Sequence, residues 1–119
     1  MNIASMMEQI KNHPQFSKAG MVLCHNGVVR ATSRDGQEVS GLEIEVDHDI
    51  LDQIISENKK KPGIVEILVH IEEGKKLNVG DDVMYLAVAG DIRENVIATL
   101  TDTLNQIKSQ VTKKTQFFR

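Results

Sequence analysis

Basic side chains gather at three places in this sequence where they could bind an anion. Arg30 ends an apolar run that begins at Met21, and Arg93 lies in the first turn of the last expected helix. A cation at a helix N-terminus opposes the helix dipole, so Arg93 is either exposed and tolerated or accompanied by an anion that the free backbone N–H groups also bind. The third group, near the chain end, consists of Lys108, Lys113, Lys114 and Arg119. These positions alone leave both an ordinary charged surface and an anion-binding site open.

Residue spacing gives little support to other kinds of chemistry. The four histidines (His13, His25, His48 and His70) and Cys24 follow no metal-ligand spacing. Adjacent strand residues such as Cys24 and His25 point to opposite faces, so they are poorly placed to share a metal. Cys24 reads as a buried apolar side chain and not as a nucleophile. We therefore predict no metal site and no cofactor, and the sequence contains no phosphate-binding glycine loop.

Length and charge narrow the class of protein. The 119 residues suit a single domain spanning 1–119, and a single cysteine suits a reducing compartment. The formal net charge of −3 and the absence of tryptophan argue against a nucleic-acid-binding protein. The N-terminal segment has no signal-peptide pattern, and no apolar run approaches the ~20 residues of a membrane span. We therefore expect a cytoplasmic protein that binds neither nucleic acid nor membrane.

Hydrophobic periodicity predicts seven elements in the order α-β-β-α-β-β-α. The expected helices cover 3–11, 47–61 and a last segment from Asp91, and the expected strands cover 21–30, 40–46, 64–74 and 83–90. Gly27 indicates a bulge in the first strand or a close approach of another backbone, and Asp35-Gly36 predicts a turn before the second. The expected fold class is α+β, with helices covering a mixed sheet.

Local signals predict where the helices begin and which faces they bury. Asp47 or Asp49 can cap the middle helix, while Asp91 and Glu94 have the spacing of a capping box at the last helix. Apolar residues in the last helix recur at spacings of three and four: Ile97, Leu100, Leu104, Ile107 and Val111. That stripe predicts a contact with a sheet or a partner. The end of the chain, SQVTKKTQFFR, is either a solvated tail or part of an anion site.

Three stretches of the sequence resemble a known family when they are read in order. GMVLCHNGVVR is similar to an opening strand that ends in G-x-V-R, and DGQEVSGLEIE is similar to the turn and strand G-x-x-V-x-x-L-x-x-E. VGDDVMYLAVAGDIR is similar to P-G-D-x-x-x-x-V-x-V-x-x-x-H-R, with Ile92 at the histidine. These motifs belong to the MoaE family, the large catalytic subunit of molybdopterin synthase. The resemblance covers 19–119, and 1–18 form an N-terminal helix and connection.

The resemblance extends to the basic residues. It places Arg30 and Arg93 on the two arginines of the motifs, and Lys108 on the first lysine of the ending Y-L-K-x-x-x-P-x-W-K. TQFFR is similar to P-x-W-K, with Arg119 at the lysine and with Gln116 and Phe118 at the proline and tryptophan. Because the spacing after Lys108 is longer than in the family, two further residues are candidates for either functional lysine: Lys113 and Lys114.

The resemblance implies an α/β hammerhead fold, a homodimer and an enzyme of molybdenum cofactor biosynthesis. Such an enzyme transfers sulfur to cyclic pyranopterin monophosphate from the C-terminal Gly-Gly thiocarboxylate of a small ubiquitin-like (MoaD-like) carrier, and the product is molybdopterin. Arginines suit the substrate phosphate, and lysines suit acid–base chemistry or stabilisation of developing charge. The implied substrate-binding residues are Arg30, Arg93 and Arg119, and the implied catalytic residues are Lys108, Lys113 and Lys114.

Two other interpretations of the same residues remain open. The substitutions at Ile92, Gln116 and Phe118 suit a non-catalytic MoaE-like paralogue that binds a carrier tail or a small anion. A dimeric α+β protein with a solvated basic end would also fit the composition. An assay for dithiolene product separates the first interpretation from the other two.

Overall fold

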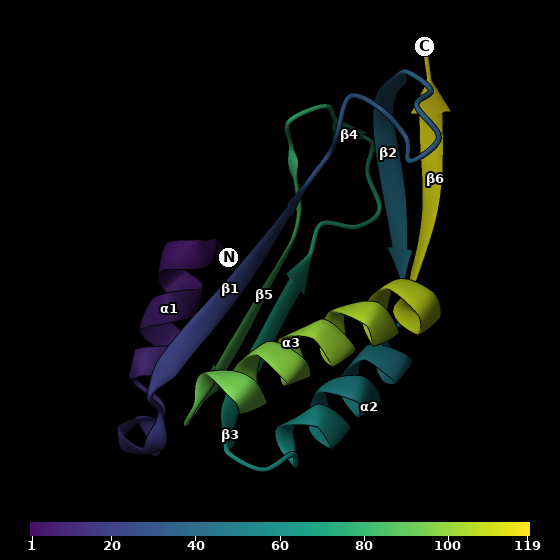
Figure 1. Ribbon diagram of the computed structural model, residues 1–119. Helices are drawn as coiled ribbons and strands as arrows, with labels where there is room; N and C mark the ends of the chain where they lie inside the picture. The colour runs from purple at the N-terminus through teal and green to yellow at the C-terminus, as the bar shows by residue number, and fades with distance from the viewer.

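Two three-stranded sheets and three helices make up the structure, a computed structural model that describes residues 1–119 (Figure 1). One sheet has the order β1 (Met21–Val28), β5 (Asp82–Gly90), β3 (Ile64–Ile71), and the other has β4 (Leu77–Asn78), β2 (Val39–Val46), β6 (Thr112–Phe118). The helices are α1 (Ile3–Lys11), α2 (His48–Lys59) and α3 (Arg93–Gln106), with a 3₁₀ turn η1 (Phe16–Lys18) and a π turn η2 (Ile107–Val111). No helix is both long and apolar enough to cross a membrane.

The predicted α+β class is confirmed, but the expected single mixed sheet is two separate antiparallel sheets. β5 is the centre of the first sheet and runs opposite to both β1 and β3. Antiparallel neighbours tolerate short connections, whereas parallel neighbours require a long crossover. The connection from β3 to β5 is short. It contains β4, which pairs with β2 of the other sheet.

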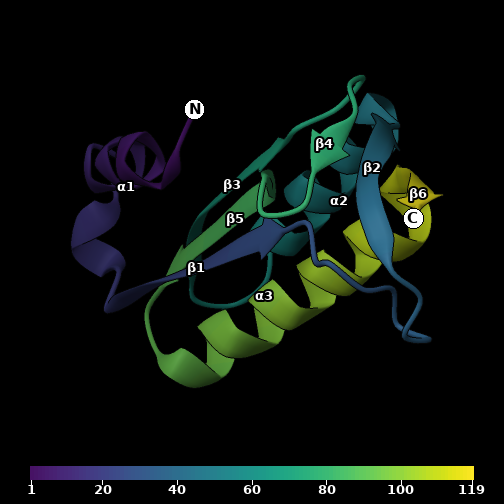
Figure 2. The same cartoon turned by 90° about the horizontal axis from the view of Figure 1, so that it is seen from above.

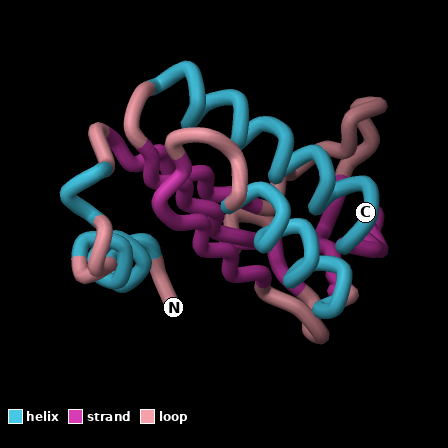
Figure 3. Tube along the Cα trace, turned by 90° about the horizontal axis from the view of Figure 1, so that it is seen from below, coloured by secondary structure: helices cyan, strands magenta, loops and turns pink.

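The first sheet is covered on both faces, which explains the continuous apolar run of β5. Figures 2 and 3 show α1 on one side of this sheet and α2 and α3 on the other. Leu86 and Val88 are fully buried among residues of the α2 and α3 side, and Ala87 and Ala89 are fully buried on the side that holds Met6 of α1. A strand with two covered faces needs apolar residues at every position.

Several local predictions are confirmed. The helix expected over 3–11 forms with those bounds, and the side chain of Asp47 caps α2 by accepting a hydrogen bond of 3.1 Å from the backbone N–H of Ile50. The pairing of β1 with β5 changes register between Gly27 and Val28, where a bulge was expected. These features depend on neighbours in the sequence, and short-range patterns predict them well.

The expected capping box at α3 is wrong. The helix begins at Arg93, and its N-cap, Ile92, makes no side-chain hydrogen bond. The carboxylate of Asp91 lies one residue too early and accepts hydrogen bonds of 2.7 Å from Ile92 N–H and 2.9 Å from Asn95 Nδ2. Glu94 extends instead toward Arg93, with 3.6 Å between Oε1 and Nε.

The apolar stripe expected on α3 is rotated at its N-terminal end. Ile97 is 49% exposed, whereas its neighbour Val96 is fully buried. Val96 packs against Gly90, where an added Cβ would lie only 2.7 Å from Val96 Cγ2. The missing side chain at Gly90 therefore admits Val96 and turns Ile97 outward. Thr99 and Thr103 share the buried face, because a threonine methyl packs like an apolar group.

The chain end is neither a continued helix nor a tail. After the π turn η2, the strand β6 pairs antiparallel with β2 and aligns Lys114 with Ile44 and Gln116 with Leu42. In Figure 1 this pair extends beyond the helices, and the C-terminus lies at its far end. The stretch SQVTKKTQFFR is therefore part of the folded domain.

Candidate functional site

A cavity of about 620 Å³ lies where the two sheets meet the end of α3. Its apolar floor includes Leu42 and Ile44 of β2, Met84 of β5 and Ile107 of η2. Its polar lining is dominated by basic side chains: His25, Arg30, Arg34, Lys108 and Lys114. No carboxylate lines it. The cavity therefore combines an apolar floor with a positively charged wall. Such a lining suits a planar or apolar ligand that carries an anionic group.

The π turn places Lys108 at this cavity. Ile107 is fully buried and anchors the turn in the core, while the next residue, Lys108, is exposed and lines the cavity. The end of the turn is held at the N-cap of α2, because Asp47 N–H donates a hydrogen bond of 3.0 Å to the carbonyl of Val111. π turns are rare and concentrate at functional sites.

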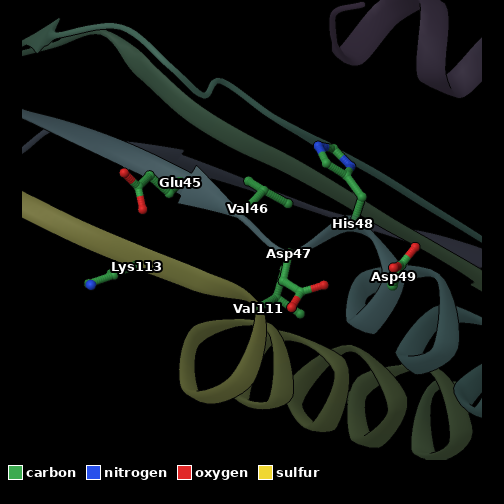
Figure 4. Close-up of a pocket in the computed structure, with 7 residues that line it drawn as sticks. All are labelled: Glu45, Val46, Asp47, His48, Asp49, Val111 and Lys113. Atoms are coloured by element: carbon green, nitrogen blue, oxygen red, sulfur yellow. The ribbon is translucent and has the colours of Figure 1, made fainter.

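Strand alternation separates the two neighbouring lysines of β6. Thr112, Lys114 and Gln116 line the cavity, so the even-numbered residues of this strand face it. Lys113 faces the opposite side and lines a shallow second hollow of about 470 Å³. Figure 4 shows that hollow, in which Lys113 shares the surface with three carboxylates: Glu45, Asp47 and Asp49.

Arg30 reaches the cavity from the segment that follows β1. Val29 is buried and fixes the end of the strand through a hydrogen bond of 2.9 Å from its N–H to the carbonyl of Asp81. The next residue, Arg30, is exposed and donates from Nε to the carbonyl of Thr32, at 2.8 Å. This bond occupies one edge of the guanidinium and leaves its terminal N–H groups free for a ligand.

Two basic residues of the cavity were not among the predicted site residues. Arg34 lies in the turn between β1 and β2, where no spacing relates it to the other cations. His25 had a detectable signal, because it follows Met21 and Leu23 at alternate positions of β1. Those two side chains pack into the core with α3, and the same face of the strand reaches the cavity at His25.

The environment of His25 favours its neutral form. Partial burial lowers the pKa of His25 below its ordinary value, and the positive charge of Lys108 lowers it further. Neutral imidazole can accept a hydrogen bond or a proton. The cavity thus combines two arginines and two lysines with one imidazole whose environment favours the neutral form.

Besides Lys113, two predicted site residues lie outside the cavity within one chain. Arg93 is at the opposite end of α3 from Lys108, roughly 22 Å away along a helix that rises 1.5 Å per residue. Its side chain is 79% exposed. Arg119 lines a separate hollow with Glu38 and Asn78, and its backbone N–H donates to the carbonyl of Glu38 at 3.1 Å. The fold of one chain therefore unites Arg30, Lys108 and Lys114 only.

Comparison of the sequence with protein families gives one clear result. The model of the MoaE protein family matches residues 1–110. A search of curated protein sequences finds no match.

Solved structures share the fold. A structure of molybdopterin synthase from Staphylococcus aureus has a TM-score of 0.82 and 22% sequence identity, with coverage of 100% of this chain and 86% of that chain. Molybdopterin cofactor biosynthesis protein E from Burkholderia multivorans ATCC 17616 has a TM-score of 0.79 and 22% identity over 100% of this chain and 82% of that chain.

A third structure, a complex of subunits 1 and 2 of molybdopterin-converting factor from Helicobacter pylori 26695, has a TM-score of 0.72 and 13% identity over 99% of this chain and 84% of that chain. The hammerhead-type α+β architecture expected from the motifs is therefore the architecture of these structures. Together with the match of the family model over residues 1–110, this establishes that the chain belongs to the MoaE protein family.

Proposed function

We propose that this chain is the large subunit of a molybdopterin synthase and transfers sulfur from a carrier protein to cyclic pyranopterin monophosphate. Membership of the MoaE family supports a role in molybdenum cofactor biosynthesis. The observation that carries the finer proposal is the convergence of Arg30, Lys108 and Lys114 on one cavity from three separate segments. The family motifs assign Arg30 to the substrate and Lys108 to the chemistry, and Lys114 is one of the two candidates for a functional lysine.

The cavity offers the groups that this reaction requires. A phosphate on the substrate would be bound by Arg30, whose free N–H groups can form charge-assisted, bidentate hydrogen bonds. The apolar floor with Met84 and Ile107 would receive the ring system. Lys108 and Lys114 would stabilise negative charge that develops as sulfur replaces oxygen, or move a proton. The sulfur arrives on the carrier, so Cys24 has no part in this scheme.

The proposed partner is a small ubiquitin-like carrier with a C-terminal Gly-Gly thiocarboxylate. The Helicobacter pylori structure is described as a complex of subunits 1 and 2 of molybdopterin-converting factor, which supports a second subunit here. A thiocarboxylate is an anion, and the four cations around the cavity would attract it. The absence of any carboxylate from the lining removes the charge that would oppose its entry.

Arg93 can take part in the same site only from a second copy of the chain. Within one chain it lies at the far end of α3 and is exposed, with Ile92, itself 53% exposed, beside it. We propose a homodimer in which Arg93 of one copy approaches the cavity of the other. Mixing a Lys108→Ala chain with an Arg93→Ala chain tests this, because mixed dimers would regain one intact site. Failure to regain activity in verified mixed dimers contradicts it.

The decisive experiment supplies thiocarboxylated carrier and cyclic pyranopterin monophosphate and measures dithiolene product. Wild type should form product, and Lys108→Ala should lose it while keeping its circular dichroism spectrum and melting temperature. Lys18→Ala is the matched control, since Lys18 is exposed on η1 and lines none of the hollows described above. A folded wild-type protein that forms no product would refute the proposed reaction.

The alternative is a MoaE-like protein that binds a carrier tail or a small anion without catalysis. It is favoured by one observation: the family histidine before Arg93 is Ile92, an N-cap residue with no side-chain hydrogen bond. The two functions differ in a simple way. Carrier binding without dithiolene product supports the alternative, and product formation excludes it.

A further inference from the structure

His25 is the lining residue of the cavity whose charge can change near neutral pH. The other charged residues of the lining are Arg30, Arg34, Lys108 and Lys114. Arginine stays protonated at all physiological pH values, and lysine and histidine titrate ordinarily near about 10.4 and 6.5. His25 is therefore the lining residue whose side-chain type ordinarily titrates closest to neutral pH.

The backbone holds His25 firmly in this position. His25 is paired with Leu86, a fully buried residue at the centre of the first sheet. The ring lies beside Gly27, where an added Cβ would be in ordinary van der Waals contact with His25 Nε2, at 3.5 Å. The imidazole is thus half-buried at the start of the bulge, where β1 turns toward Arg30.

The charged groups around His25 all have the same sign. Lys108 reaches it from η2, Lys114 lies across the cavity on β6, and Arg30 and Arg34 follow β1. Asp82, the carboxylate of β5, does not line the cavity. It accepts hydrogen bonds from Tyr85 and Asn26. Glu72, after β3, is likewise outside the cavity and pairs with His70 and Lys75.

We propose that anion binding in this cavity is coupled to protonation of His25, so that a dianion such as a phosphate monoester binds together with one proton. The inference rests on the anion-binding part of the proposed function and is independent of sulfur transfer. In the empty cavity a fifth positive charge would be repelled by four others. A bound dianion reverses that balance and favours imidazolium, which has an N–H donor on both ring nitrogens.

The direction of the pH dependence follows from linkage. With the cavity empty, burial and Lys108 hold the pKa of His25 low; with a dianion bound, the same pKa rises. Between these two values, binding takes up a proton and the affinity increases as the pH falls. For one coupled proton the limit is about tenfold in affinity per pH unit. Above both values the affinity should no longer depend on this group.

Sulfate is the appropriate probe, because it remains a dianion between about pH 5 and 8 and so adds no titration of its own. Calorimetric titration of sulfate in two buffers of different protonation enthalpy measures the protons taken up. We expect uptake approaching one proton per sulfate in wild type, and none in His25→Gln, which binds sulfate with little change in affinity from about pH 5 to 8. His48→Gln is the control, since His48 is exposed, pairs with Glu73 and lies outside the cavity.

Each result of this experiment has a definite meaning. Sulfate binding without proton uptake in wild type, or equal uptake in folded His25→Gln, overturns the inference and leaves the proposed reaction untouched. No sulfate binding at all overturns both the inference and the anion site. Coupled sulfate binding in a protein that forms no dithiolene product confirms the inference and refutes the reaction.

Discussion

Asn58 of α2 donates a hydrogen bond of 2.8 Å from Nδ2 to Oε1 of Gln106, the last residue of α3. Asn58 is only 1% exposed and also donates to the carbonyl of Ile54, at 2.8 Å. The next residue after Gln106 begins the π turn that carries Lys108. This buried contact therefore joins α2 to the point where α3 ends and the π turn that leads to the cavity begins.

Replacing Asn58 should destabilise the protein. Asn58→Ala removes the partner of Gln106 and leaves a small cavity between the helices, so we expect a loss of about 1–3 kcal/mol in the free energy of unfolding. Urea denaturation followed by circular dichroism measures it. Gln53→Ala, on the exposed face of the same helix, should change stability by no more than about 0.5 kcal/mol. Equal effects of the two variants would show that the buried contact is unimportant.

The separation of the two β6 lysines predicts opposite effects on anion binding. Lys114→Ala should weaken sulfate binding by about tenfold, which corresponds to the loss of one charge-assisted hydrogen bond of about 1.4 kcal/mol. Lys113→Ala should leave the affinity within about twofold, because Lys113 lines the other hollow. Calorimetry at fixed pH and ionic strength measures both. A larger loss from Lys113→Ala would mean that the strand faces the cavity with its odd-numbered residues.

Two glycines with positive φ should respond very differently to a methyl group. Gly36 has φ +86° and open space around it, so Gly36→Ala should cost only the backbone penalty of about 1–2 kcal/mol. Gly63 has φ +78°, and an added Cβ would collide with the carboxylate of Asp91. That carboxylate holds Ile92 and Asn95 at the start of α3. Gly63→Ala should therefore lower the melting temperature clearly more than Gly36→Ala, and similar melting temperatures would contradict this.

The hydrogen bond from Tyr85 to Asp82 predicts a specific pH dependence of stability. The hydroxyl of Tyr85 donates to Asp82 Oδ2 at 2.5 Å, and this bond, with a second from Asn26, holds the pKa of Asp82 below its ordinary value. A carboxyl whose pKa is lowered on folding stabilises the protein above its unfolded pKa, near about 3.9, and the contribution disappears as the pH falls through the folded value. Tyr85→Phe removes the larger of these two contributions.

The melting temperature of Tyr85→Phe should therefore lie furthest below that of wild type at neutral pH, and the gap should narrow as the pH falls below about 4. Melting curves of both proteins across this range measure the gap. The ring itself is kept, so its stacking with His70 at a centroid distance of 6.0 Å is retained. A gap that stays constant from neutral to acid pH would show that Asp82 is not the group involved.

The sequence itself predicts those structural features that depend only on neighbouring residues. The bounds of α1, the cap that Asp47 provides for α2 and the bulge after Gly27 all follow from short-range patterns, and all three are confirmed. The ordered motifs also selected Arg30 and Lys108, which the structure brings to one cavity. Helix periodicity and capping need only a few adjacent positions, so a single sequence contains enough information to predict them.

Only the tertiary structure decided what the chain end does and which basic residues share a cavity. The strand β6 exists because β2, some seventy residues earlier in the chain, offers it a hydrogen-bonding edge. The Ser40 hydroxyl adds a side-chain hydrogen bond to the carbonyl of Phe117. That pairing sets the alternation by which Lys114 lines the cavity and Lys113 lines the other hollow. Strand pairing joins residues far apart in sequence, and no local pattern contains its register.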